Sequence, residues 1–229
     1  MWKHVLIGIL GLVSAQSRAD DALTATEARW IDAGRPVVSY AKRQKLPLDI
    51  VVQPDERPGE APLAMAFVDG RCTLALTMRG NPHAEAALNG VDPALLPVLI
   101  EAMTAHEIGH CWRYVGGAWH TLPAGFVDAA TEAPDDDREL VVKRRDMRQA
   151  RREEGFADLV GLAWTWAQYP QHYARVQAWF EQVRDDRPGE HHDTRAWIRL
   201  VRDPQAFSAG ATPFEQVRGL WRQGLLDED

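Results

Sequence analysis

Residues 92–117 read DPALLPVLIEAMTAHEIGHCWRYVGG, and this stretch predicts the element around which the chain folds. Its pattern is helical, and we expect a long helix within residues 92–115 that ends at Gly116-Gly117. The centre of this helix carries His106-Glu107-Ile108-Gly109-His110. Gly109 lowers the helix propensity by about 1 kcal/mol relative to Ala. We therefore expect another backbone to approach there, or a tight packing contact.

The two histidines of this pentapeptide stand four residues apart, so a helix presents both imidazoles on one face. Such a pair can chelate one metal ion, and Glu107 beside it can hold and deprotonate a water molecule at that ion. A catalytic Zn²⁺ ion keeps three protein ligands and one open position, so a third ligand should lie elsewhere in the chain. The motif therefore predicts a zinc site with His106 and His110 as ligands and Glu107 as general base.

A second acidic motif, Glu153-Glu154-Gly155-Phe156-Ala157-Asp158, lies in the expected helix Arg138–Gln168. Glu154 and Asp158 are four residues apart and share one helix face. A carboxylate ligand at Glu154, with an acid one turn later, fits the need for an acceptor that orients a ligand histidine. Glu153 is an alternative ligand, although the spacing to Asp158 favours Glu154.

Other side chains between the two motifs are of types that also bind zinc. They are His120, Asp128, Glu132 and the run from Asp135 to Asp137. The acidic run is typical of a solvated loop and helix cap. The longer motif HExxHxxGxxH requires Gly at position 113 and His at position 116, where this chain has Arg and Gly. The metzincin class is therefore excluded.

Together, HExxH and ExxAD resemble the gluzincin clan of zinc metallopeptidases, above all the CAAX prenyl protease and heat-shock protease group and its soluble relatives. The resemblance covers the two motif helices and the spacer 111–153. It implies a zincin-like fold and attack of a metal-bound water on a peptide carbonyl. The implied roles are zinc ligand for His106, His110 and Glu154, support of a ligand for Asp158, and general base and then acid for Glu107.

In the same relatives a His-Pro pair, with an Arg further on, follows the ExxAD helix and contributes to the active site. The nearest stretch here is HHDTRAWIR, residues 191–199, in which the proline is missing and the Arg spacing differs. The resemblance implies His192 as a catalytic residue that stabilises an oxyanion. The alternative is a polar cap on a helix that begins near Thr194, with Asp193 or Thr194 as N-cap.

The first third of the chain predicts a small antiparallel sheet. Leu48–Gln53 is short and β-branched, and Leu63–Val68 and Cys72–Met78 flank Asp69-Gly70, which is a strong hairpin signal. The strand Cys72–Met78 either borders the cleft and pairs with an extended substrate, or is covered by its neighbours.

The remainder of the chain predicts helices. The patterns lie at Leu23–Lys45 (as two short helices or one kinked helix, because of Gly34-Arg35-Pro36), Arg138–Gln168, Gln171–Arg184, Thr194–Arg202 and Pro213–Gly224. A sheet followed by helices, without βαβ alternation, predicts an α+β fold.

Residues 1–19 are typical of a secretory signal, with a basic start, an apolar run from Val5 to Val13 and small residues after it. We expect cleavage of this segment after Ala15 or Ala19, and we expect residues 20–229 to form a single domain. The apolar run is too short for a bilayer core, which needs roughly 20 residues. We therefore expect no stable membrane span after cleavage and a periplasmic or secreted location.

The composition indicates which classes of partner are excluded and whether the cysteines are oxidised. The net charge of -7, without a long basic run, argues against a nucleic-acid partner. The two cysteines, Cys72 and Cys111, are more often bridged than free in an exported protein. We expect a disulfide between them, with two buried thiols as the alternative.

The function expected from the sequence is that of a zinc metallopeptidase, a hydrolase that acts on a peptide or protein substrate. The alternative is a non-catalytic zinc-binding scaffold or interaction protein with the same fold. An intact Glu107 weighs against this alternative, because a site without turnover requires no base.

Overall fold

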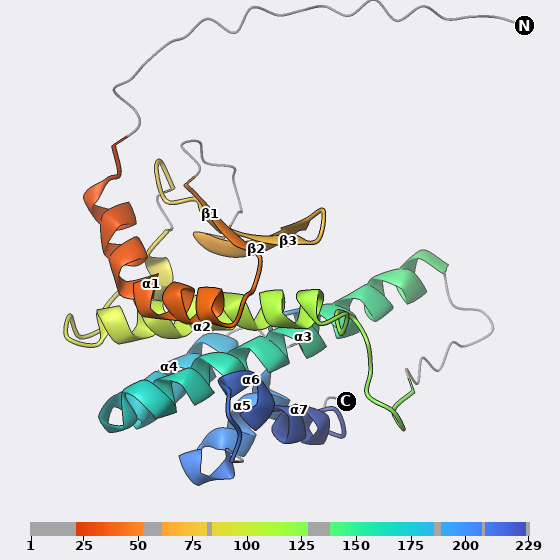
Figure 1. Ribbon diagram of the computed structural model, residues 1–229. Coiled ribbons are helices and arrows are strands. Elements are labelled where there is room, and N and C mark those ends of the chain that lie inside the picture. Colours follow the sequence, from red (N-terminus) through yellow and green to blue (C-terminus); the bar gives the residue numbers. More distant parts are fainter. Residues whose placement is uncertain are drawn as a thin grey trace, which may run out of the picture.

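The computed structural model describes residues 22–52, 61–81, 84–127, 138–185, 189–207 and 209–227. These residues form an α+β structure with a small sheet on one side of a helical body (Figure 1). The predicted signal segment, residues 1–19, lies outside the described residues. The elements are α1 (Ala25–Arg43), β1 (Leu48–Val52), β2 (Leu63–Val68), β3 (Arg71–Leu76), η1 (Ala86–Leu88), α2 (Leu96–Val115), α3 (Arg138–Gln168), η2 (Pro170–His172), α4 (Tyr173–Asp185), α5 (Arg195–Ile198), η3 (Arg199–Val201), η4 (Pro204–Ala206), α6 (Pro213–Gln216) and α7 (Arg218–Gly224).

Helix α1 begins at a capping box formed by Thr24 and Glu27. The Thr24 hydroxyl accepts a hydrogen bond from the Glu27 backbone N–H (3.2 Å), and the Glu27 carboxylate accepts one from the Thr24 N–H (2.7 Å). Pro36 does not end the helix, although proline lacks an N–H and its ring clashes with the preceding turn. The helix instead bends along its length (Figure 1), so this segment is one bent helix and not two short ones.

The three strands form one sheet in the order β1-β3-β2. β2 and β3 are the expected hairpin, with Leu63 opposite Leu76 and positive φ angles at Asp69-Gly70. β1 is parallel to β3, with Leu48 beside Cys72. The expected antiparallel sheet is therefore wrong for one of its two pairings. The hairpin turn fixes β2 against β3, but residues 53–62 separate β1 from β2 in the sequence, so no hairpin signal sets the partner of β1 and its pairing depends on packing.

Helices α2 and α3 cross in close contact at the centre of the molecule. A Cβ atom at Gly109 would lie 3.2 Å from the Ala157 Cα, and one at Gly161 would lie 2.8 Å from the Ala102 carbonyl oxygen. The close backbone approach expected at Gly109 is therefore confirmed, because a larger side chain would push the helices apart. The crossing places the HExxH face of α2 against the ExxAD face of α3.

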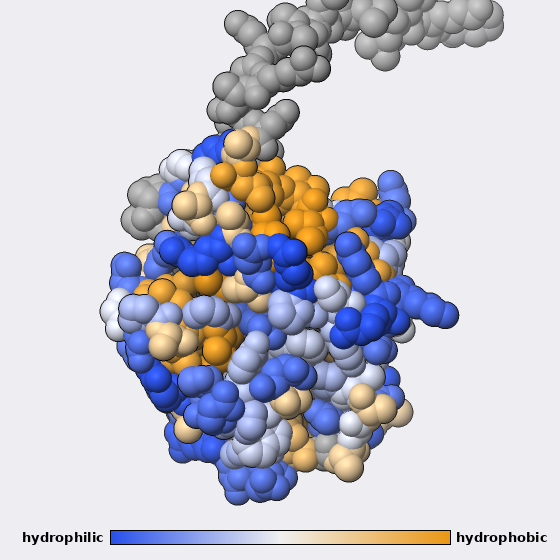
Figure 2. Space-filling model, turned by 60° about the vertical axis from the view of Figure 1, so that its left-hand side comes forward, coloured by the Kyte–Doolittle hydropathy of each residue, from blue (hydrophilic) through white to orange (hydrophobic). Residues whose placement is uncertain are grey.

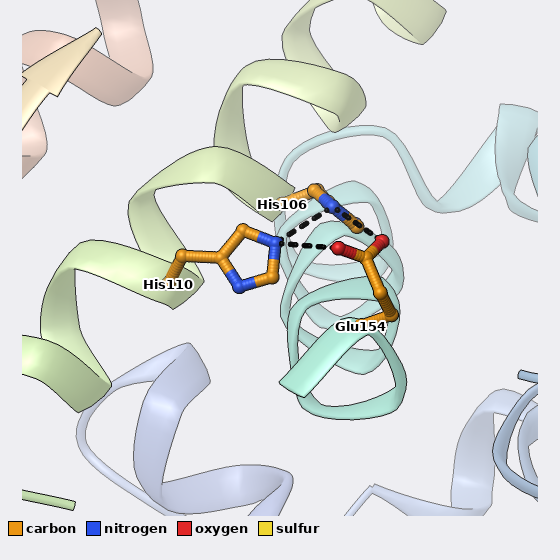
Figure 3. Close-up of side chains that lie close together, drawn as sticks. All are labelled: His106, His110 and Glu154. Atoms are coloured by element: carbon orange, nitrogen blue, oxygen red, sulfur yellow. Dashed lines mark hydrogen bonds and ion pairs between the residues drawn. The ribbon is translucent and has the colours of Figure 1, made fainter. Parts of the chain in front are cut away.

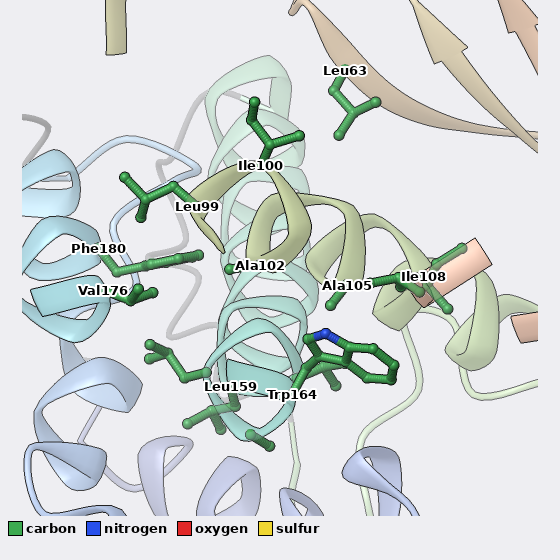
Figure 4. Close-up of a cluster of buried hydrophobic side chains, with 14 of the residues drawn as sticks. Leu63, Leu99, Ile100, Ala102, Ala105, Ile108, Leu159, Trp164, Val176 and Phe180 are labelled. Atoms are coloured by element: carbon green, nitrogen blue, oxygen red, sulfur yellow. The ribbon is translucent and has the colours of Figure 1, made fainter. Parts of the chain in front are cut away.

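A single cluster of buried hydrophobic side chains joins the sheet to α2, α3 and α4 (Figure 4). Leu99 and Ile108 of α2, Leu159 of α3 and Phe180 of α4 are almost completely buried in it, and Leu63 of β2 attaches the sheet. Burial of each such side chain contributes roughly 1.5–3 kcal/mol. This cluster therefore holds α2 and α3 together where the faces that carry the two sequence motifs meet.

The C-terminal elements pack on α3 around Trp197. This side chain lies against Gly155 and Gly224 and donates its indole N–H to the Trp221 carbonyl oxygen (2.9 Å). Helix α3 has the predicted bounds, whereas the last two predicted helices are each split into short pieces. In the part of the chain that the structure describes, no helix is long and apolar enough to cross a bilayer.

Candidate metal centre

Helix α2 carries His106 and His110 one turn apart, and Glu154 of α3 faces both rings (Figure 3). The two Nε2 atoms are 3.1 Å apart. Glu154 Oε2 lies 3.4 Å from the Nε2 of His106, and Glu154 Oε1 lies 3.3 Å from the Nε2 of His110. One ligand atom from each of the three side chains lies within 4.8 Å of the others. The two sequence motifs therefore meet in space.

This donor set fits a small divalent cation in tetrahedral geometry. Bonds of about 2.0–2.1 Å place neighbouring ligands of a tetrahedral zinc ion roughly 3.3 Å apart, and the observed separations are 3.1, 3.3 and 3.4 Å. Glu154 Oε2 is buried and accepts no hydrogen bond from the described residues. A buried carboxylate oxygen without a donor is costly unless positive charge meets it. The group His106, His110 and Glu154 can therefore hold a metal ion.

Asp158 fixes the orientation of His106. Its Oδ1 atom lies 2.7 Å from His106 Nδ1. When Nδ1 carries the proton and donates it to this carboxylate, Nε2 keeps its lone pair for a metal ion. The position is the one expected for an acid that supports a ligand histidine.

Asp158 is held in turn by Arg184 of α4 and by Thr194. The Arg184 guanidinium donates two hydrogen bonds to its carboxylate, at 2.9 and 2.8 Å, and the Thr194 hydroxyl donates one at 2.5 Å. Burial disfavours charge on Asp158, but Arg184 and His106 lower its pKa below the usual value. No sequence motif indicates Arg184, because it is a single Arg on α4, and the sequence pattern predicts Thr194 only as a helix cap.

The carboxylates of this centre require a positive partner. Burial disfavours the charged imidazole of His106, yet Glu154 and Asp158 raise its pKa to about 10. Burial also disfavours charge on Glu154, yet His106 and His110 hold its pKa well below the usual value. In the metal-free protein a proton on His106 supplies the positive charge, and a metal cation at the same point would replace it.

Glu107 lies beside the ligand group and lines the cleft above it. Burial raises its pKa, and the opposing effects of His106 and His110 are smaller. A carboxyl group whose pKa is shifted toward neutrality is well suited to accept a proton and return it. The geometry therefore leaves Glu107 available for the role that the sequence predicts.

A cleft of about 380 Å³ opens over the ligand group. Its walls are largely aromatic and aliphatic, and they include Trp30, Met65, Phe67, Trp119, Trp179 and Phe180. The strand in this wall is β2, which is an edge strand. Of the two alternatives for Cys72–Met78, the second holds, because β3 lies between β1 and β2 and does not line the cleft.

His192 reaches the centre from the segment before α5. Its Nε2 atom lies 3.5 Å from Glu154 Oε2, and its side chain lines the cleft. Burial lowers its pKa, which favours the neutral ring. Thr194 occupies the N-cap position of α5, but its hydroxyl serves Asp158 and makes no capping hydrogen bond.

The two alternative ligands that the structure describes, Glu153 and His120, do not join this group. Glu153 lies against Arg113 of α2 instead, which donates to its carboxylate (3.0 Å). His120 is exposed on the loop after α2, and its backbone N–H donates to Glu153 Oε1 (2.8 Å). The remaining candidates, Asp128, Glu132 and Asp135 to Asp137, lie outside the described residues.

The expected disulfide between Cys72 and Cys111 is present, with Cα atoms 5.7 Å apart. It joins β3 to α2 at the residue that follows His110. Cys72 is also paired with Phe67, a residue of the cleft wall, across the β2–β3 hairpin. The bond therefore ties the wall of the cleft to the helix that carries the histidines, and a bond of this kind is typical of oxidising, extracytoplasmic compartments.

Comparisons of the chain with protein-family models, with curated proteins and with solved structures give no match.

Proposed function

We propose that the protein is a zinc-dependent peptidase. The observation that carries this proposal is the convergence of His106, His110 and Glu154 at the spacing of a tetrahedral site, with Glu107 beside them in an open cleft. Two imidazole nitrogens and one carboxylate oxygen are a common ligand set for catalytic zinc. The HExxH and ExxAD motifs that resemble gluzincins are the same residues that meet here.

Bound zinc would supply a Lewis acid that polarises a peptide carbonyl and lowers the pKa of a water molecule. Glu107 accepts a proton from the attacking water and returns it to the leaving amine. His192 lies 3.5 Å from Glu154 Oε2 as a neutral donor, and we assign it the stabilisation of the oxyanion. Asp158, held by Arg184 and Thr194, keeps His106 in the orientation that binds zinc.

The cleft suits a peptide in extended conformation. Its wall contains the edge strand β2, whose outer backbone groups can pair with a substrate strand. The apolar side chains around the ligand group can receive the substrate's side chains. We place the protein in the periplasm or outside the cell, because the disulfide and the signal-like residues 1–19 point to export.

The test uses protein exported by its own signal and purified without added metal. We expect one zinc ion per chain and hydrolysis of casein, an unfolded substrate, that a chelator abolishes and zinc restores. Glu107→Gln should keep the zinc and reduce hydrolysis by at least about 100-fold, because the amide preserves the shape but cannot take the proton. Glu139→Gln, an exposed change on α3, is the control.

Undiminished hydrolysis by Glu107→Gln would contradict the mechanism. If the wild-type protein carries zinc but cleaves neither casein nor a broad peptide library, the non-catalytic scaffold is the better assignment. Absence of zinc and of other divalent metals from the exported protein would contradict both.

A further inference from the structure

A second cavity, of about 250 Å³, lies between α1 and the inner face of the sheet. Figure 2 is turned about the vertical axis from the view of Figure 1, so each element stays at the same height in both pictures. At the height of the sheet, hydrophobic side chains gather on the surface in Figure 2. A band of hydrophilic side chains runs below them. The cavity shares only Trp30 and Leu63 with the metal cleft, so these two side chains separate the two spaces.

Much of the wall of this groove is aliphatic. Val38 of α1, Ile50 of β1, and Leu74 and Leu76 of β3 line it, and Thr104 of α2 forms part of the lining. The Thr104 hydroxyl already donates to the Ile100 carbonyl oxygen (2.8 Å). Polar groups buried in such a space would lose their hydrogen bonds with water and find few replacements. The groove therefore favours a hydrocarbon chain and disfavours a peptide backbone.

One rim of the groove carries positive charge. Arg35, Ser39 and Lys42 line it from one side of α1, at spacings of four and three residues. Arg35 pairs with Asp32 on the exposed surface, and Asp49 of β1, which does not line the groove, is bound by Arg71 through two hydrogen bonds of 2.8 Å. Lys42 lies near enough to Asp49 to lower the pKa of that carboxyl, and no ion pair of Lys42 is found among the described residues. This rim stands out in a chain whose net charge is -7.

We propose that this groove binds the single acyl chain of a fatty acid, with the hydrocarbon against Val38, Ile50 and Leu74 and the carboxylate at Arg35, Ser39 and Lys42. The cavity is smaller than the roughly 300 Å³ at which pockets for drug-sized ligands begin, so it accommodates one narrow chain and not the two chains of a phospholipid. The aliphatic walls and the cationic rim match the two ends of such a molecule. This assignment does not depend on peptidase activity, because the groove contains none of the metal ligands.

The test is calorimetric titration of the exported, zinc-loaded protein with dodecanoate, at concentrations far below those at which it forms micelles. We expect one saturable site. The exposed pair change Arg35→Glu with Lys42→Glu should weaken binding at least tenfold. Arg43→Glu is the matched control, since Arg43 is the neighbour of Lys42 on α1 and does not line the groove. Dodecanol, which has no charge, should bind at least tenfold more weakly than dodecanoate.

A second pair of variants places the ligand in the groove. Ile50 and Val51 are adjacent on β1, both are partly exposed, and their side chains point to opposite faces of the sheet. Ile50→Glu should abolish dodecanoate binding, and Val51→Glu should leave it unchanged.

Equal loss from both β1 variants, or equal binding by the Arg35→Glu, Lys42→Glu protein and the wild type, would overturn the proposal. So would a heat signal that appears only when micelles form. Binding of dipalmitoyl phosphatidylglycerol vesicles or of an acidic leucine-rich peptide, without binding of dodecanoate, would assign the groove to a different partner and would also overturn it.

Discussion

Two clusters of charged side chains lie between helices α2 and α3, and they are built from similar residue types but differ in their chemical state. In one, Arg113 of α2 and Glu153 of α3 form a buried ion pair, with Nη2 and Oε1 3.0 Å apart. In the other, His106 and His110 of α2 face Glu154 of α3. Each cluster places basic side chains of α2 against one carboxylate of α3, and the two carboxylates are neighbours in sequence.

The Arg113 cluster is closed by fixed hydrogen bonds. Arg113 also donates to the carbonyl oxygens of Ala118 (2.7 Å) and Thr121 (3.2 Å), and the His120 N–H donates to Glu153. These bonds satisfy the charges with protein groups and hold the loop after α2. The cluster therefore stabilises the fold, and both oxygens of its carboxylate already accept hydrogen bonds from protein groups.

The His106 cluster is open at its centre. Two Nε2 atoms and the Glu154 oxygens converge, and Glu154 Oε2 has no hydrogen-bond donor among the described residues. Its outer members, by contrast, are firmly held through Asp158 and Arg184. The His106 cluster thus has a satisfied periphery and an unsatisfied centre, as a group that can hold a metal ion requires, whereas the Arg113 ion pair is satisfied throughout.

The largest effect on folding is expected for Glu153→Ala. The change leaves the Arg113 charge buried without its carboxylate, and we expect the free energy of unfolding to fall by about 3–5 kcal/mol. Urea denaturation of the metal-free protein measures this. The double variant Arg113→Met, Glu153→Leu should recover most of the loss, because neither charge remains. Zinc should stay bound to the folded fraction of Glu153→Ala, and its loss would break the distinction between the two carboxylates.

Reduction of the disulfide is expected to have the second-largest effect on the stability of the fold. In the chain-entropy model, closing the loop between Cys72 and Cys111 stabilises the fold by roughly 3–4 kcal/mol. We expect no free thiol in the denatured, unreduced protein exported from its native host. Reduction should lower the unfolding temperature while zinc remains bound, because the ligands lie on α2 and α3 and not on β3. Two titratable thiols in the unreduced sample would contradict the bond.

Glu154→Ala should weaken zinc binding strongly and should lower the free energy of unfolding much less. Removal of a ligand should weaken zinc binding by more than the roughly 100-fold that is the upper figure for residues that only orient a ligand. Competition with a chromogenic chelator measures the affinity. In the metal-free protein this variant should be more stable than Glu153→Ala, because no guanidinium loses its main partner. Zinc affinity equal to that of the wild type would remove Glu154 from the ligand set.

The smallest effect on zinc binding is expected for Asp158→Asn, which tests the residues that surround the open centre of the His106 cluster. The amide keeps the shape but loses the charge that orients His106, and we expect zinc binding to weaken by about 10- to 100-fold. Thr194→Val, which removes a single hydrogen bond to Asp158, should weaken it less than Asp158→Asn. The same chelator competition compares all three proteins, and the opposite order would show that Thr194 contacts more than Asp158 alone.

The sequence by itself determined what depends on neighbours along the chain. The four-residue spacings put His106 with His110, and Glu154 with Asp158, on single helix faces, and these spacings follow from the helical period alone. The bounds of α3 and the β2–β3 hairpin also follow from local patterns. The pairing of Cys72 with Cys111 needed only the number of cysteines and the expected compartment.

The tertiary structure alone decided what depends on how the elements pack. It placed β1 parallel to β3, turned Glu153 toward Arg113, and brought Arg184 to Asp158 from a different helix. The sequence pattern of a single segment cannot predict any of these contacts, because each contact depends on the angle and distance between two elements. Those angles follow from the burial of the shared core and from the close approach at Gly109, which is why the site is complete only in the folded chain.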